Sequence, residues 1–137
     1  MHWLVYALIS AGAAGATAIL AKVGVRGIPP DLATAVRTLV VLAFAVAIVF
    51  AKGEHEALRL VRGRTILFLM LSGIATGVSW LAYFRALQLA PASRVAPIDK
   101  LSLPITILIA ALALGETISW RMMIGVALMV GGALLTI

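Results

Sequence analysis

Long apolar segments alternate with short polar ones along the whole chain. A helix needs about 20 apolar residues to cross the hydrocarbon of a bilayer. Five segments meet that requirement, and the linkers between them are short: Trp3–Ala21, Leu32–Ala51, Thr65–Ala90, Arg94–Leu114 and Trp120–Ile137. We therefore expect an all-α membrane protein with five transmembrane helices in one domain, residues 1–137.

Local signals predict where these helices stop and start. Pro29-Pro30-Asp31 predicts a helix end followed by a restart. Gly115-Glu116 ends the fourth helix, and Ser119 is the expected N-cap of the fifth. The main polar linker, residues 52–64, predicts a short interfacial helix with apolar and basic sides, formed by Ala57, Leu58 and Val61 beside Arg59 and Arg62.

Small residues recur at helical spacing in three of the segments. Gly73 and Gly77 form a GxxxG pair, and Gly125 and Gly132 lie seven residues apart. Ala11 with Gly15, and Gly12 with Ala16, repeat the pattern in the first segment. Such residues let helix backbones approach closely, so we expect them at helix–helix contacts.

Composition supports the membrane assignment. Of 137 residues, 64% are hydrophobic and only 12% are charged, far from the balance of a soluble domain. The net charge of +6 does not indicate nucleic acid, because the basic residues flank apolar spans. Cysteine is absent, and His2 and His55 cannot build a metal site, so we expect no cofactor and no metal. His55 is expected in a solvated loop. Only Met1 and His2 precede the first span, which lacks a basic n-region, and we expect no signal peptide.

Polar residues inside the spans are the candidate site. Arg37 lies about 7–8 Å inside the second helix, where either snorkelling or function explains it. In the third, Ser72, Thr76, Ser79 and Tyr83 form one stripe, with Trp80 beside it; these hydroxyls either face the bundle interior or bond their own helix. Arg85 is expected to snorkel.

The fourth span contains Asp99 and Lys100 together with Pro97 and Pro104. Charges at membrane depth are functional-site candidates, and the prolines predict a bent helix. Adjacent helical residues point about 100° apart. We therefore expect Asp99 and Lys100 to have partners elsewhere and not to pair with each other.

The basic residues show almost no asymmetry between the two membrane sides. One side receives Lys52, Arg59, Arg62, Arg64 and Arg121, and the other receives Lys22, Arg26 and Arg94, with Arg37, Arg85 and Lys100 on the same half of the spans. The positive-inside rule needs such an asymmetry. Either the polar linker sets one orientation, or the chain inserts both ways and forms an antiparallel homodimer, which would reproduce an inverted-repeat transporter.

Several runs of the sequence resemble the EamA domain of the drug/metabolite transporter superfamily. They are ALQLAPASRVAP at residues 86–97, Leu114-Gly115-Glu116, and GVALMVGG at residues 125–132. The resemblance implies an inner-membrane transporter in which five helices make one half of a ten-helix fold. It also implies fold and helix-breaking roles for Pro97, Pro104 and Glu116. The first span lacks the glutamate of the related small multidrug antiporters, so we do not expect proton-coupled export of cationic drugs.

Together these observations predict a transporter of a small polar metabolite, amino-acid-like, anionic or zwitterionic, that works by alternating access. The alternative is an accessory subunit that pairs with another half-transporter; an enzyme is not expected, because no nucleophile–base group occurs. The expected partners are the lipid bilayer, the solute and a second copy of the chain. The expected substrate-binding residues are Arg37, Thr76, Ser79, Trp80, Tyr83, Asp99 and Lys100.

Overall fold

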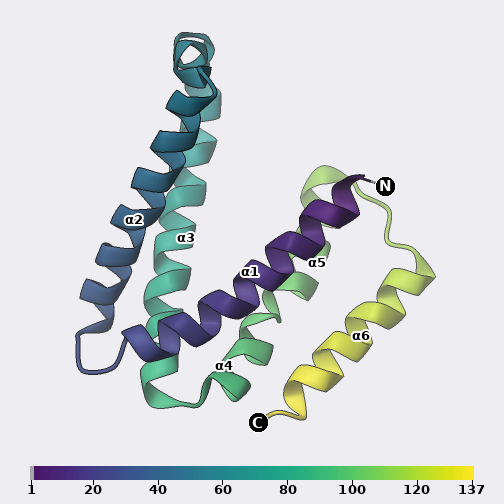
Figure 1. The fold of residues 1–137 in the computed structure, drawn as a ribbon. Coiled ribbons are helices and arrows are strands. Elements are labelled where there is room, and N and C mark those ends of the chain that lie inside the picture. The colour runs from purple at the N-terminus through teal and green to yellow at the C-terminus, as the bar shows by residue number, and fades with distance from the viewer. Residues whose placement is uncertain (1) are drawn as a thin grey trace. The chain divides into compact units, whose positions relative to one another are not determined.

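The computed structural model describes residues 2–137, apart from the side chains of Leu58 and Arg59. In this part of the chain every regular element is helical: α1 (His2–Gly24), α2 (Pro30–Ala51), the 3₁₀ helix η1 (Glu54–Leu60), α3 (Gly63–Leu89), α4 (Ala92–Asp99), α5 (Ser102–Leu114) and α6 (Trp120–Leu134) (Figure 1). The prediction of an all-α chain is confirmed.

Four stretches are long and apolar enough to cross a membrane: α1, α2, α3 and the combined stretch Ala92–Leu114. The last helix, α6, is apolar but has 15 residues. It is three residues shorter at its carboxyl end than the predicted span to Ile137. At 1.5 Å per residue it is about 22 Å long, less than the roughly 30 Å thickness of the hydrocarbon.

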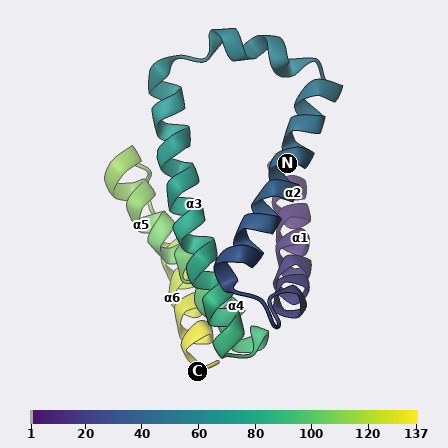
Figure 2. The same cartoon turned by 90° about the vertical axis from the view of Figure 1, so that its left-hand side faces the viewer.

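The chain forms two compact units, which are described separately. The first unit, residues 21–88, contains the end of α1, then α2, η1 and most of α3. Within it, α2 and α3 converge at the end where α2 begins and separate toward η1, which joins them (Figure 2). The second unit, residues 1–20 and 89–137, contains the rest of α1 and the helices α4 to α6, with α6 in contact with α4 and α5.

The fourth predicted span is broken, as its prolines predicted, and the break lies at Lys100–Leu101 between α4 and α5. Pro104 explains this position, because proline has no N–H to offer the carbonyl four residues earlier and its ring crowds that carbonyl. That carbonyl belongs to Lys100, and it accepts instead from the Leu103 N–H at 3.0 Å. Pro97 lies inside α4 without ending it.

The other helix boundaries follow the local signals. α2 begins at Pro30 with Pro29 as its N-cap residue. Ser119 caps α6 by accepting a hydrogen bond from the Met122 N–H at 3.2 Å. α5 ends at Gly115, whose φ of 70° is a left-handed conformation that glycine adopts without steric cost. Next to it, the Glu116 N–H donates to the Ala110 carbonyl at 3.4 Å, so Glu116 contributes to the helix end through its backbone.

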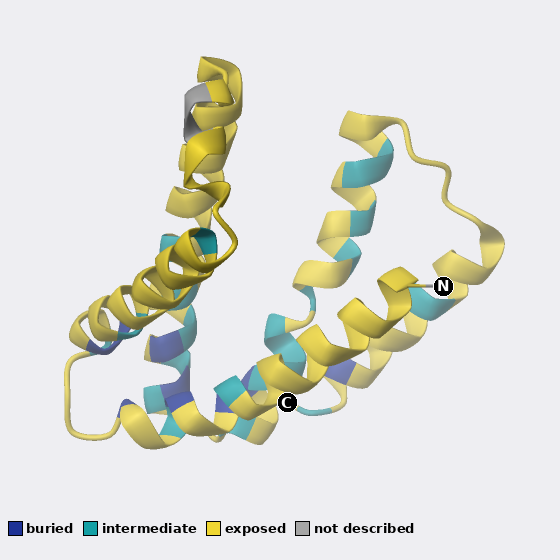
Figure 3. Cartoon of the chain, turned by 45° about the horizontal axis from the view of Figure 1, so that its top comes forward, coloured by how far each residue is buried: buried dark blue, intermediate teal, exposed yellow. Residues whose placement is uncertain are grey.

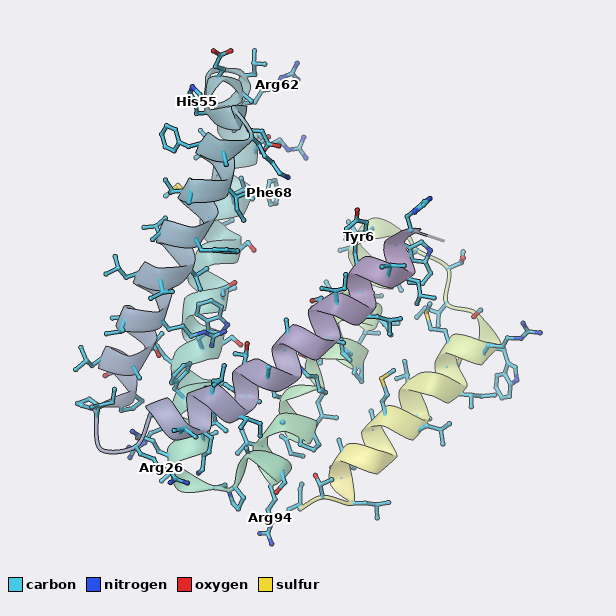
Figure 4. All side chains as sticks on the ribbon, viewed as in Figure 1. Tyr6, Arg26, His55, Arg62, Phe68 and Arg94 are labelled. Atoms are coloured by element: carbon cyan, nitrogen blue, oxygen red, sulfur yellow. The ribbon has the colours of Figure 1, made fainter. Side chains whose placement is uncertain are left out.

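The polar linker forms a short helix, as predicted, but this helix is a 3₁₀ helix and ends at Leu60. Val61 therefore lies outside it, and the expected side chains of Leu58 and Arg59 lie outside the described residues. His55 is exposed, as expected (Figure 4), but it belongs to η1. Its ring stacks on that of Phe50, with ring centroids 5.3 Å apart.

Few residues are buried within the chain, and most of every long helix is exposed (Figure 3). A Cβ atom placed on Gly73 or Gly77 would meet no atom of another element within 4 Å, and the same holds for Gly12, Gly15, Gly125 and Gly132. The expected close helix contacts at these glycines are therefore absent within each described unit. Lipid, the other unit or another protein chain must cover the apolar helix faces.

Candidate functional site

Arg37 lies against aromatic side chains of α3. Its guanidinium carbon is 4.1 Å from the centroid of the Trp80 ring and 5.6 Å from that of Phe84. Both distances are within the range of a cation–π attraction, to which tryptophan contributes most. Phe84 is almost completely buried, whereas Arg37 and Trp80 are half-buried. Two residues predicted for the site from different spans are thus in contact.

The position of Arg37 bears on the two explanations of its charge. It lies seven residues beyond Pro30 and hence about 10 Å along α2. Snorkelling would direct the guanidinium along its own helix toward the headgroups. Instead it lies over rings of α3, and Trp80 is itself nine residues before the end of that helix. Arg37 therefore contacts side chains of a second helix in its unit.

The predicted stripe of hydroxyl-bearing residues on α3 is more exposed than the aromatic residues that contact Arg37. Ser72, Thr76 and Ser79 are exposed, and Tyr83 is half-buried. The Thr76 hydroxyl donates to the Ser72 carbonyl at 2.9 Å, which is a bond within its own helix. The neighbouring stripe of Trp80, Phe84 and Leu87 is the one that is directed inward. Of the two interpretations of the hydroxyls, the local one holds for Thr76.

The structure corrects the prediction that was made for Asp99 and Lys100. The Lys100 ammonium lies 3.4 Å from the Asp99 carboxylate and forms an ion pair with it, so the prediction that they would not pair is wrong. The prediction assumed a regular helix through both residues. α4 ends at Asp99, and the long flexible lysine side chain bends back at that end. The pair is partly solvent-accessible, with side-chain exposures of 55% for Lys100 and 33% for Asp99.

The predicted site residues fall into two groups. Arg37, Thr76, Ser79, Trp80 and Tyr83 belong to the unit of residues 21–88. Asp99 and Lys100 belong to the other unit, at the junction of α4 and α5. Within the first group, Arg37 and Trp80 are in contact although they lie on different helices.

A polar cluster at the end of α3 was missed in the sequence. The Gln88 side-chain amide donates to the carbonyls of Val25 at 3.2 Å and Ile28 at 2.8 Å, and its oxygen accepts from Arg85 at 3.2 Å. Lys22 donates to the Leu87 carbonyl. The signal was present, because polar residues at the ends of consecutive spans meet on one side of a membrane.

This cluster surrounds a cavity of about 310 Å³ lined by Lys22, Val25, Arg26, Gly27, Leu87 and Gln88. Arg26 lies in the turn between α1 and α2 (Figure 4). Val25 and Leu87 are buried to 1% and 0% exposure, so the polar bonds surround a small apolar contact. The arrangement ties the α1–α2 turn to the end of α3.

A second cavity of about 390 Å³ lies between α5 and α6, and its lining is apolar: Pro104, Ile105, Ile107, Leu108, Ile118, Met123, Val126 and Ala127. Such a lining suits lipid or another apolar helix face and offers no group that would orient a polar solute. Among the described residues there is also no group of three histidine or acidic side chains placed to hold a metal ion.

Comparison with known proteins agrees with this arrangement of apolar helices. The sequence matches the EamA-like transporter family over residues 1–137. A relative from Sinorhizobium sp., named as an uncharacterized transporter in the cobO 3′ region, is 51% identical over 133 residues, which cover 97% of this chain and 94% of the relative. No solved structure matches the sequence significantly.

Proposed function

Because this chain belongs to the EamA-like transporter family, we propose that it carries a small polar solute across the membrane by alternating access, as an antiparallel homodimer. The family and the transporter-named relative identify it as a multi-pass membrane transporter, which points away from an enzyme. The observation that carries the proposal further is the contact of Arg37 with Trp80, since a charge kept at membrane depth marks a solute pathway.

The solute site is proposed to consist of Arg37 on α2 and Trp80, Thr76, Ser79 and Tyr83 on α3. Trp80 and Tyr83 offer a wall with both apolar and polar parts. Asp99 and Lys100 are proposed as a separate group of substrate-binding residues in the other unit, where they form an ion pair at a helix break. Transporters commonly bind solutes where a spanning helix is interrupted, because the irregular backbone there faces a cavity.

Dimerisation is supported by the amount of uncovered helix surface. A Cβ placed on the described glycines of α1, α3 and α6 would meet no atom of another element of the same unit within 4 Å. We propose that residues 1–137 act as one half-transporter and that a second, inverted copy completes the ten-helix fold. The nearly equal numbers of basic residues on the two membrane sides favour insertion in both orientations.

Reporter fusions after Ile137 test the inverted arrangement. We expect a reporter that is active only in the cytoplasm and one that is active only outside it to give comparable signals. A signal confined to one side would refute dual insertion and with it the antiparallel homodimer.

Transport itself is tested with the purified protein alone in lipid vesicles. Labelled L-serine, L-lactate, phosphate and ethylammonium serve as probes of zwitterionic, anionic and cationic solutes. We expect saturable exchange of at least one probe, and Trp80→Ala should lower it at least about tenfold. Exchange that appears only when a second half-transporter is added would instead identify an accessory subunit, and no exchange in either case would contradict solute transport.

A further inference from the structure

The cations in and near the spans differ in what they contact. Arg85 donates to the Gln88 amide, Lys22 donates to a backbone carbonyl, and Lys100 pairs with Asp99. Arg37 contacts aromatic rings, and no acceptor within the described residues receives a hydrogen bond from it. Its guanidinium therefore has N–H donors that are available to a ligand.

The acidic residues in the unit that contains Arg37 lie away from the Arg37 position in the sequence. The unit of residues 21–88 contains three acids: Asp31, Glu54 and Glu56. Asp31 lies in the first turn of α2, six residues before Arg37, and is exposed; the other two belong to η1, beyond the far end of α2. A cation at this depth without an anion is costly, which favours an anion supplied from outside the unit.

The aromatic contacts also prepare Arg37 for one kind of ligand. A guanidinium over a ring has its face covered while its edge, which carries the N–H donors, stays open. That edge matches the two oxygens of a carboxylate or phosphate group and binds them with paired hydrogen bonds. Because Trp80 and Phe84 restrict the side chain before binding, less conformational entropy is lost when the anion arrives.

We propose that Arg37, held by Trp80 and Phe84, binds the carboxylate or phosphate group of the solute, so that the transported substrate class is organic anions. This inference rests on the proposed transport function. Asp99, the acid within the spans that would hold an amine, is already paired with Lys100. The arrangement thus favours anions over cations such as amines.

Binding can be measured without transport. Trp3→Phe and Trp120→Phe leave Trp80 as the single tryptophan of the chain, which has three. In a maltoside detergent, which carries no phosphate, acetate and inorganic phosphate should each change the Trp80 fluorescence saturably. Ethylammonium at the same ionic strength should not.

Substitutions in the same background identify the residue responsible. Arg37→Gln should weaken acetate binding at least about tenfold, the loss expected for charge-assisted hydrogen bonds, and Arg37→Lys should weaken it less. The matched control is Arg64→Gln, because Arg64 also lies over a ring, that of Phe68 at 5.8 Å, but at the exposed start of α3. Its affinity should equal that of the parent.

The outcomes separate this inference from the transport proposal. Equal acetate affinity in the parent and in both Arg37 variants would overturn the inference, as would vesicle exchange that Arg37→Gln leaves unchanged. Binding that depends on Arg37, without any vesicle exchange, would support the anion site and contradict transport. A lipid headgroup offers the same phosphate chemistry; a response to phosphatidylglycerol in nanodiscs, with none to soluble anions, would assign the site to lipid and overturn the solute assignment.

Discussion

Gln88 uses every hydrogen-bonding group of its side chain. A glutamine amide has two N–H donors and an oxygen acceptor. The donors bind the Val25 and Ile28 carbonyls in the turn after α1, and the oxygen accepts from Arg85 one turn earlier on α3. Carbonyls in this turn have no partner in a regular helix, so Gln88 compensates for the interruption between α1 and α2.

Gln88→Leu should loosen this turn while keeping most of the side-chain volume. The change removes three hydrogen bonds, and the loss of the two that reach the turn is expected to cost about 1–3 kcal/mol of unfolding free energy. Hydrogen–deuterium exchange of the amides of residues 25–28 should accelerate, with little change in the middle of α3. Thr76→Val is the control, because the Thr76 hydroxyl bonds its own exposed helix; unchanged exchange in the turn of the Gln88 variant would contradict the assigned role.

At the scale of elements, the junction of α4 and α5 divides one apolar stretch of 23 residues into two helices. Pro104 accounts for the break because the Lys100 carbonyl lies four residues before it and receives no helical hydrogen bond from it. Pro97 has a smaller effect, since the carbonyl it leaves unpaired belongs to Ser93, in the first turn of α4. The two prolines are therefore not equivalent.

Pro104→Ala should join α4 and α5 into one helix. Spin labels at Ser93 and Leu112 would then approach a separation of about 28 Å, the length of a straight helix of that size. The chain has no cysteine, so two introduced cysteines carry the labels without interference. Pro97→Ala is the matched control and should leave the parent distance unchanged. An unchanged distance in Pro104→Ala would mean that another feature causes the break.

At the scale of the whole molecule, most apolar surface is not covered by the chain itself. The glycines of α3 illustrate this, because Gly73 and Gly77 have open space where the close approach of another helix was predicted. If the proposed dimer uses this face, a larger residue there will interfere with the dimer and not with the folding of one chain.

Gly77→Leu should accordingly weaken dimerisation at least about tenfold while leaving the helical content unchanged. Light scattering coupled to size-exclusion chromatography in detergent measures the dimer, and circular dichroism measures the helices. Ala75→Leu places the same side chain on another side of α3 and should leave the dimer intact. A dimer of full strength in Gly77→Leu would exclude this face from the interface.

The sequence alone determined the features that depend on local chemistry. Apolar length set the spans α1 to α3, Pro29-Pro30 and Gly115 placed helix ends, and Ser119 formed the expected cap. Each is decided within a few residues by backbone hydrogen bonding or allowed φ values. The family resemblance was also available from short runs of the sequence, and the match over residues 1–137 confirmed it.

Only the tertiary structure decided which faces are used. Helical periodicity shows that Thr76 and Ser79 share one face of α3 and that Trp80 lies beside it, but not how the helix is rotated toward α2. The contact with Arg37 revealed that rotation. The pairing of Asp99 with Lys100 likewise depended on where α4 ends. The contacts of Gln88 depended on two segments, more than 60 residues apart in sequence, that meet at one end of a unit. Such contacts follow from how helices approach one another, which a periodic pattern leaves open.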